Sequence, residues 1–250
     1  MNAARWGRKA QRPPAAEENA GAAAKALSYV LERGARVQEP AVTAYVQRLR
    51  RIFPDASPAE IVAKLEQRYL GAAMASGAAV GSAAAFPGIG TIAAMSAVAG
   101  ETVLFLETTA LFVLAVAEVH GIPVEQREVR RALVLSVLVG DESKGAVRDL
   151  VGPGRTSGAW LGESTAALPM PVVSQLNNRL LRYFVKRYTL KRGVMAFGKM
   201  LPMGIGAAIG GGGNRLMAKK IIGNAHKAFG PTPARWPRAL HALPPASASQ

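Results

Sequence analysis

Three titratable residues, Glu107, Glu118 and His120, stand in or beside an apolar run that extends from about Glu101 to Val119. At 100° of rotation per residue, a helix would bring Glu107 and Glu118 within about 20° of each other, on one polar stripe. Carboxylates in apolar helices either pair with a base or relay ions and protons. Because buried charges are usually paired, the stripe favours a structural polar seam bonded to Arg127, Arg130 or another helix, with His120 at its end. An enzyme that uses these three residues is the alternative.

Other patterns that could carry catalysis lack their structural context. The histidines His120, His226 and His241 have no metal-ligand spacing, and the chain contains no cysteine. The segment Gly88–Ala93 satisfies a dinucleotide fingerprint, but no strand is predicted before it. The segment Gly162–Ala166 only approximates a nucleophile elbow. The sequence therefore predicts no enzyme activity, no metal and no cofactor.

Positive charge is concentrated at the carboxyl-terminal end of the chain. The net charge is +15, and residues 181–250 contain twelve Lys or Arg but no Asp or Glu. A basic block beside apolar sequence is typical of contact with anionic lipid or nucleic acid, although a solvated, solubilising face is the alternative. The absence of a recognisable helix-turn-helix or sheet motif argues against nucleic acid. The residues expected to contact anions are Lys186, Arg187, Lys191, Arg192, Lys219 and Lys220.

Helix signals begin in the first quarter of the chain. Apolar residues between Val42 and Phe53 follow helical spacing, which predicts an amphipathic helix. The sequence Ser57-Pro58-Ala59-Glu60 forms a capping box with proline at the first helical position, so a helix should start at Pro58. Residues 71–100 carry no charge and are interrupted by Pro87, Gly88 and Gly90. This break predicts a helical hairpin or a kinked pair.

Further helices are expected in the second half of the chain. An apolar helix should run from about Glu101 to Val119, and the next should open at Pro123 and stop at Gly140. Residues 141–170 predict a long connection, and two helical stretches follow at about 171–199 and 206–229. The break between these stretches, at Pro202, Gly204 and Gly206, is similar to the one at Pro87, Gly88 and Gly90.

These elements predict an all-α fold: a compact helical bundle with Gly/Ala-rich apolar hairpins, either membrane-associated or with a very apolar core. The expected organisation is a flexible basic amino terminus at 1–20, one helical domain at 21–230, and a disordered Pro/Ala-rich tail at 231–250. No signal peptide is predicted, because the basic start runs into polar sequence and not into an apolar core.

Membrane insertion is marginal on sequence grounds. The break at Pro87 divides the uncharged run into pieces that are too short to span a bilayer. In the following helix, the central Glu107 would cost about 2.5–3.5 kcal/mol on insertion scales. The sequence therefore leaves open whether the apolar helices span, lie on or avoid the membrane. It also leaves open whether the protein is peripheral or inserted as a hairpin.

The order of several short motifs is similar to that of the EcsC family of bacterial proteins. The motifs are Phe86–Gly88, Ala117–Ile122, Arg130–Leu133, Val139-Gly140, Leu201–Gly206 and Asn214-Arg215, and they extend across most of residues 60–230. The alanine and arginine richness resembles actinobacterial members of that family.

This resemblance implies a helical, membrane-associated protein with no catalytic residues to assign. The family is named for a component encoded beside an ABC transporter. The expected function is a non-enzymatic accessory or scaffold protein at the cytoplasmic face of the inner membrane, with anionic lipid and a membrane protein such as a transporter as partners. A soluble nucleic-acid-binding protein and an enzyme with an unrecognised site are the rival hypotheses.

Overall fold

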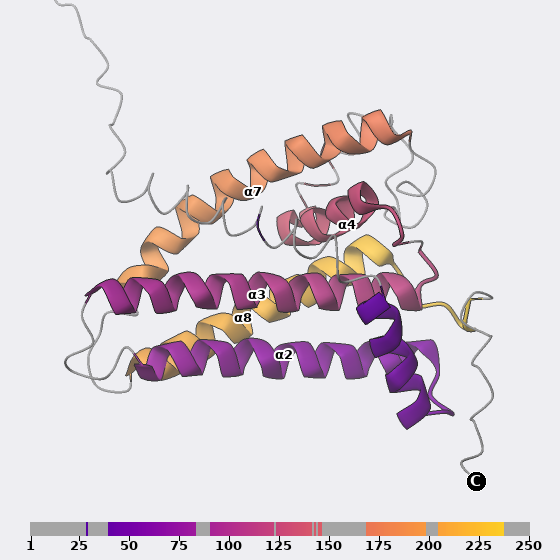
Figure 1. The fold of residues 1–250 in the computed structure, drawn as a ribbon, viewed down its shortest axis with the longest axis horizontal. Coiled ribbons are helices and arrows are strands. Elements are labelled where there is room, and N and C mark those ends of the chain that lie inside the picture. Colours follow the sequence, from indigo (N-terminus) through magenta and orange to yellow (C-terminus); the bar gives the residue numbers. More distant parts are fainter. Residues whose placement is uncertain are drawn as a thin grey trace, which may run out of the picture.

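A computed structural model describes residues 29, 40–83, 91–122, 124–141, 143, 145–146, 169–198 and 205–237, with the backbone alone at 80–83, 91–99, 185–198 and 205–211. Within these ranges the regular structure is helical and contains no strand, which confirms the all-α prediction (Figure 1). The helices are residues 40–52, α2 (Pro58–Ala83), α3 (Thr91–Val119), α4 (Arg127–Val139), α7 (Met170–Gly198) and α8 (Ile205–Phe229).

The capping box at the start of α2 is formed as predicted. The backbone N–H of Ser57 donates to Glu60 Oε2 at 2.7 Å, and the backbone N–H of Glu60 donates to Ser57 Oγ at 3.3 Å. The hydrogen bond from the Ser57 backbone, followed by that from its side chain, lowers the pKa of the Glu60 carboxyl. These bonds satisfy two amide groups that a helix start leaves without partners, so α2 begins at Pro58.

Helix α3 is longer than the sequence pattern indicates. We expected an apolar helix from about Glu101, but α3 begins at Thr91 and passes through Gly100 without a break. A glycine inside a helix costs only about 1 kcal/mol, which packing against neighbouring helices readily offsets. The break motif at Pro87, Gly88 and Gly90 lies outside the described residues, and α2 and α3 on either side of it pack against each other.

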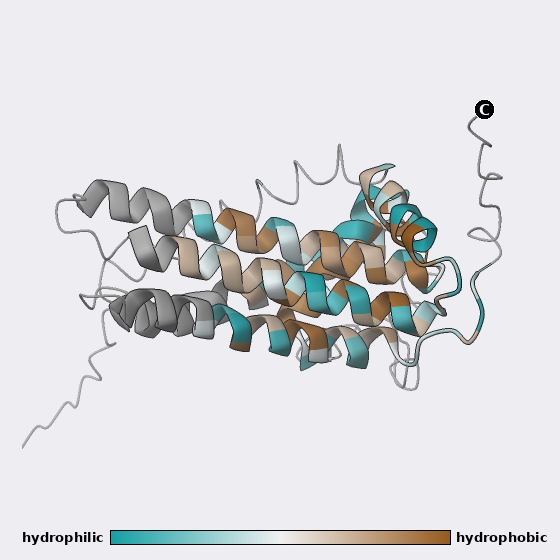
Figure 2. Ribbon diagram, turned by 90° about the horizontal axis from the view of Figure 1, so that it is seen from below, coloured by the Kyte–Doolittle hydropathy of each residue, from teal (hydrophilic) through white to brown (hydrophobic). Residues whose placement is uncertain are grey.

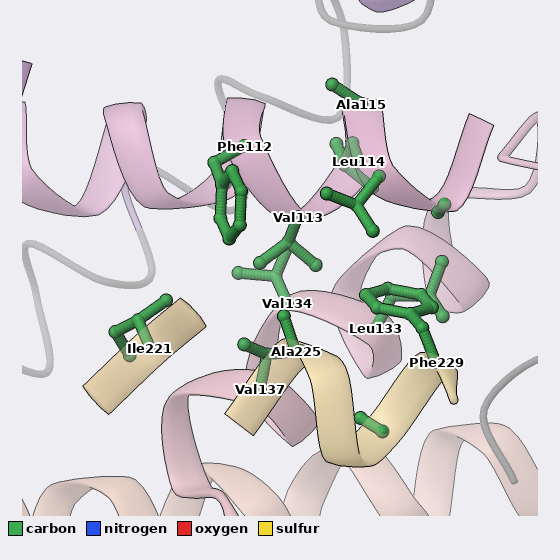
Figure 3. Close-up of a cluster of buried hydrophobic side chains, with 14 of the residues drawn as sticks. Phe112, Val113, Leu114, Ala115, Leu133, Val134, Val137, Ile221, Ala225 and Phe229 are labelled. Atoms are coloured by element: carbon green, nitrogen blue, oxygen red, sulfur yellow. The ribbon is translucent and has the colours of Figure 1, made fainter. Parts of the chain in front are cut away.

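The helices form two levels around a shared core. Helix α2 packs against α8 and α3, while α4 packs against α3 and α8 and is covered by α7 (Figure 1). Apolar and hydrophilic residues alternate along the long helices, as Figure 2 shows by colour. Phe112 and Val113 of α3 meet Leu133 of α4 and Phe229 of α8 in the buried cluster of Figure 3. Helices α3, α4 and α8 therefore share this part of the core.

Helix α4 starts later than predicted and ends where predicted. We expected it to open at Pro123, but it begins at Arg127, and the buried Arg130 donates from Nη1 to the carbonyl oxygens of Val124 (2.6 Å) and Glu125 (2.8 Å). These bonds hold the preceding residues in an extended lead-in. At the other end Gly140 has φ 77° and its N–H donates to Ser136 O at 2.9 Å. Glycine adopts this left-handed conformation without a steric penalty, so it stops the helix.

The structure differs from the sequence prediction at the start of the carboxyl-terminal tail. We expected disorder from residue 231, but residues 231–237 lie against the bundle. The Arg50 guanidinium sits 4.2 Å from the centre of the Trp236 ring, and Pro237 packs so closely on Gly121 that a Cβ there would meet it at 2.7 Å. Trp236 thus anchors a segment whose composition alone suggested disorder.

Several predictions fall outside the described residues. These are the flexible start at 1–20, the break residues Pro202 and Gly204, and the tail from 238 to 250. Of the connection expected at 141–170, the described residues 141, 143, 145 and 146 are helical. Gly206 is the second residue of α8.

Candidate functional site

A buried polar junction joins three helices near the middle of the bundle. Asn214 of α8 donates from Nδ2 to Glu101 Oε1 of α3 at 3.0 Å and to the backbone oxygen of Ala73 in α2 at 3.1 Å. Glu101 is only 1% exposed, and Asn214 is buried as well. A buried carboxylate needs hydrogen-bond partners to offset its lost hydration, so this junction fixes how α2, α3 and α8 meet.

Sequence spacing does not predict this junction. Glu101 marks the start of the predicted apolar helix, and Asn214 belongs to a distant motif, 113 positions along the chain. The available signal was a carboxylate at the start of the apolar run and an amide directly after the glycine-rich run 204–213, because buried polar groups usually find hydrogen-bond partners.

Two more buried asparagines tie helices together in the same way. Asn177 of α7 donates to Glu128 Oε2 at 2.6 Å and to the Glu128 backbone oxygen at 3.1 Å. Asn224 of α8 donates to the backbone oxygen of Val137 at 2.9 Å, near the end of α4. All three asparagines therefore connect neighbouring helices of the bundle.

The predicted polar seam does not converge on one site. Glu118 accepts a hydrogen bond from Thr43 Oγ1 at 3.2 Å, so it faces the helix 40–52. His120 Nδ1 donates to the backbone oxygen of Val116 at 2.9 Å, and its ring lies 5.3 Å from the Phe229 ring of α8. Glu107 is partly exposed. Glu118 and His120 thus serve different helix contacts, which leaves the enzyme hypothesis without a shared catalytic geometry among these residues.

His120 instead meets two other titratable residues at the end of the bundle. Glu66 of α2 and His226 of α8 form a hydrogen bond, and together with His120 they line a small cavity (about 10 Å³). Burial lowers the pKa of His120, while the backbone oxygens of Val116 and Gly230 oppose that change. Among the described residues, Nε2 of His120 is buried without a well-aligned hydrogen bond.

Neither of the two most pronounced cavities among the described residues has room for an organic substrate. Each measures about 10 Å³, which suffices for roughly one water molecule, whereas small-molecule sites usually enclose about 300–1,000 Å³. Within the same part of the chain, no three His, Asp or Glu side chains are grouped to hold a metal ion.

The predicted anion-contact residues divide into two groups. Lys219 and Lys220 are exposed on α8, and the exposed Arg215 lies one helical turn before Lys219. The other four belong to α7, where only the backbone is described; they are Lys186, Arg187, Lys191 and Arg192. The described side chains therefore place these three cations on the surface of α8, together with Lys227, which is paired with Asp141.

One stretch among the described residues, Gly100–Val119, is long and apolar enough to cross a membrane by length and composition. In the structure, 67% of its most apolar window is buried inside the bundle. The core helix of a water-soluble bundle has the same composition, so this stretch is weak support for a transmembrane segment.

No family model, curated protein or solved structure matches the chain.

Proposed function

We propose that the protein is a peripheral membrane protein that acts without catalysis, as an accessory or scaffold at the cytoplasmic face of the bacterial inner membrane. The observation that carries this proposal is the exposure of Arg215, Lys219 and Lys220 on α8, within a region of seventy residues that has no acidic residue. Each basic side chain near an anionic lipid surface contributes about 1 kcal/mol of attraction.

A peripheral position is favoured over an inserted hairpin because α3 already has protein partners. Phe105, Leu106 and Leu114 of α3 are almost completely buried by neighbouring helices. Insertion would exchange these contacts for lipid contacts of similar polarity, and Glu101 would be separated from Asn214. The intact bundle therefore supports binding through its charged surface.

The partner class follows from the resemblance to the EcsC family. On that basis, we propose a membrane protein such as a transporter as the neighbour that the bundle supports, with anionic lipid as the second partner. Copurification of the tagged protein from solubilised membranes tests the protein partner. A membrane protein should be captured with it, and capture of none would contradict this part of the proposal.

Membrane fractionation and vesicle sedimentation test the proposed function. The expressed protein should sediment with membranes, leave them in high salt, and bind vesicles containing anionic phosphatidylglycerol but not neutral phosphatidylcholine. Release only by detergent would instead indicate insertion. Recovery in the soluble fraction without binding to either vesicle would rule out the proposal.

A matched pair of variants identifies the surface. Arg215→Gln on α8 should weaken binding to anionic vesicles about fivefold, as expected for about 1 kcal/mol. Arg127→Gln, which removes an exposed arginine at the start of α4, should leave binding unchanged. Equal losses in the two variants would show that net charge alone, and not the α8 surface, drives binding.

A further inference from the structure

Cationic and aromatic side chains gather at the end of the molecule formed by the helix 40–52, the first turns of α2 and residues 231–237 (Figure 1). Three cation–π contacts hold this region together. Arg50 lies 4.2 Å from the Trp236 ring centre, and Lys64 Nζ lies 3.7 Å from that of Phe53. Arg68 lies 6.0 Å from the ring centre of Tyr45.

An apolar tip projects from this region. Ile52 is 50% exposed at the end of the helix 40–52, and it is followed by the partly exposed Phe53 and the exposed Pro54. Arg48 lies one turn before Ile52 on the same helix face, and Arg51 directly precedes Ile52; both arginines are exposed. Hydrophilic and hydrophobic residues accordingly alternate on the short helix at the right of Figure 2.

We propose that this tip, defined by Arg48, Arg51 and Ile52, is a membrane-insertion site for an anionic bilayer surface. Ile52 enters the boundary between headgroups and acyl chains, while Arg48 and Arg51 contact lipid phosphates. The inference rests on the proposed peripheral function and adds a second contact surface, which the concentration of charge in residues 181–250 did not indicate. The basic α8 surface supplies attraction over distance, and the tip supplies apolar anchoring.

The arrangement of the aromatic rings favours lipid over nucleic acid. Single-stranded nucleic acid binds by stacking its bases on open aromatic faces. Here Phe53, Tyr45 and Trp236 each have a cation of this chain over the ring. The exposed aliphatic side chain of Ile52 offers no stacking surface, but it suits the acyl boundary of a bilayer.

The local charge weakens the electrostatic part of this contact. Asp55 and Glu60 are exposed near the tip and partly cancel the attraction of Arg48 and Arg51 for an anionic surface. Apolar burial of the single Ile52 side chain adds to this weakened attraction, and the combined contact is still released when high salt screens the charges.

Vesicle binding by the full chain tests the inference with two matched variants. Ile52→Ser and Leu104→Ser each remove a half-exposed aliphatic side chain, since Ile52 is 50% and Leu104 is 51% exposed. Ile52→Ser should weaken binding to phosphatidylglycerol-containing vesicles about fivefold, as expected for completing the burial of half an isoleucine. Leu104→Ser, on α3, should leave binding unchanged, and circular dichroism should show both variants to be folded.

A second measurement reports insertion directly. The chain has no cysteine, so Ile52→Cys and Leu104→Cys can each carry one environment-sensitive fluorophore. Emission from position 52 should shift to the blue on anionic vesicles, and emission from position 104 should not. Equal shifts at both positions, or none at position 52, would overturn the insertion site.

The outcomes separate this inference from the proposed function. If the wild-type protein binds no anionic vesicles, the proposed function fails and the inference fails with it. If wild type and Ile52→Ser bind equally well, the inference alone fails. If Arg48→Gln with Arg51→Gln abolishes binding of single-stranded DNA in a filter assay but leaves vesicle binding intact, the surface is a nucleic-acid site and the inference is overturned.

Discussion

Buried amide side chains set the contacts between helices in this protein. Asn214, Asn177 and Asn224 each donate from Nδ2 to a backbone oxygen of another helix, and two of them also reach a carboxylate. Hydrogen bonds to charged groups in a low-dielectric interior are stronger than those between neutral groups at the surface. A bundle with few large aromatic side chains thus gains specific helix positions from a small number of polar contacts.

Removing the Asn214 amide tests this role. Asn214→Ala should lower the free energy of unfolding by about 2 kcal/mol, because Glu101 loses a buried donor. Urea denaturation followed by circular dichroism measures the change. Asn178→Ala, at an exposed position of α7, is the control and should change it by less than about 0.5 kcal/mol. Equal stability of the two variants would show that the junction is not a stabilising contact.

The partly buried ring of His120 should make stability depend on pH. Burial lowers its pKa below the ordinary value of 6.5, so the unfolded chain binds a proton at a higher pH than the folded chain. This contribution to the free energy of unfolding is intact above about pH 6.5 and is lost as pH falls from there through the lower folded-state pKa.

The His120 contribution is isolated by comparing variants. The urea concentration at the unfolding midpoint should decrease as the pH is lowered from about 7 to about 5.5. In His120→Gln this decrease should be smaller, because the titrating ring is removed. His226→Gln is the control for the neighbouring histidine, which is hydrogen-bonded to Glu66. A wild-type pH dependence in His120→Gln would contradict the assignment.

At the scale of elements, glycine ends one helix of the bundle and is accommodated inside another. Gly140 ends α4 with a positive φ, and a Cβ there would lie 2.7 Å from Asn224 Nδ2. Gly71 lies in the interior of α2, where a Cβ would meet nothing within 4 Å. Helix boundaries here depend on backbone conformation and on neighbouring side chains, and glycine content by itself does not locate them.

Alanine substitution should therefore separate the two glycines. Gly140→Ala should lower the free energy of unfolding by about 2 kcal/mol, because it combines a left-handed backbone with a clash against Asn224. Gly71→Ala should raise it by up to about 1 kcal/mol, because alanine favours the helix. Thermal and urea unfolding measure both changes, and a stabilising Gly140→Ala would refute the clash.

For the whole molecule, the central question is whether the bundle stays closed at the membrane. Helix α3 has one exposed and one buried leucine close together: Leu104 is 51% exposed, and Leu106 is 1% exposed. A closed bundle keeps this difference in exposure between Leu104 and Leu106 when it binds the membrane. An opened hairpin would instead expose α3 to lipid on several faces.

Cysteine labelling measures this difference directly. In Leu104→Cys a water-soluble maleimide should react quickly, and in Leu106→Cys it should react slowly, with or without anionic vesicles. The reaction at position 106 should be slow because a buried thiol reacts only after local unfolding exposes it. If Leu106→Cys on vesicles instead reacts readily with a lipid-soluble maleimide, position 106 has left its protein contacts and faces lipid, which would indicate hairpin insertion.

Local patterns in the sequence were sufficient for several elements. The capping box predicted the start of α2 at Pro58, and Gly140 predicted the end of α4, because both signals act within one helical turn. The predicted stretches at about 171–199 and 206–229 agree closely with α7 and α8. The association with a membrane stays a proposal, since composition describes a spanning helix and a buried core helix equally well.

Tertiary structure decided what long-range contacts control. Sequence spacing placed Glu107 and Glu118 on one polar stripe with His120 at its end, but packing directs Glu118 to Thr43 and His120 to Phe229. The Glu101–Asn214 contact joins residues 113 positions apart, and the Arg50–Trp236 contact anchors a segment that reads as a tail. The chain by itself determined which residues favour a helix, because propensity and capping are local; the fold alone determined their partners, because partners depend on how distant helices meet.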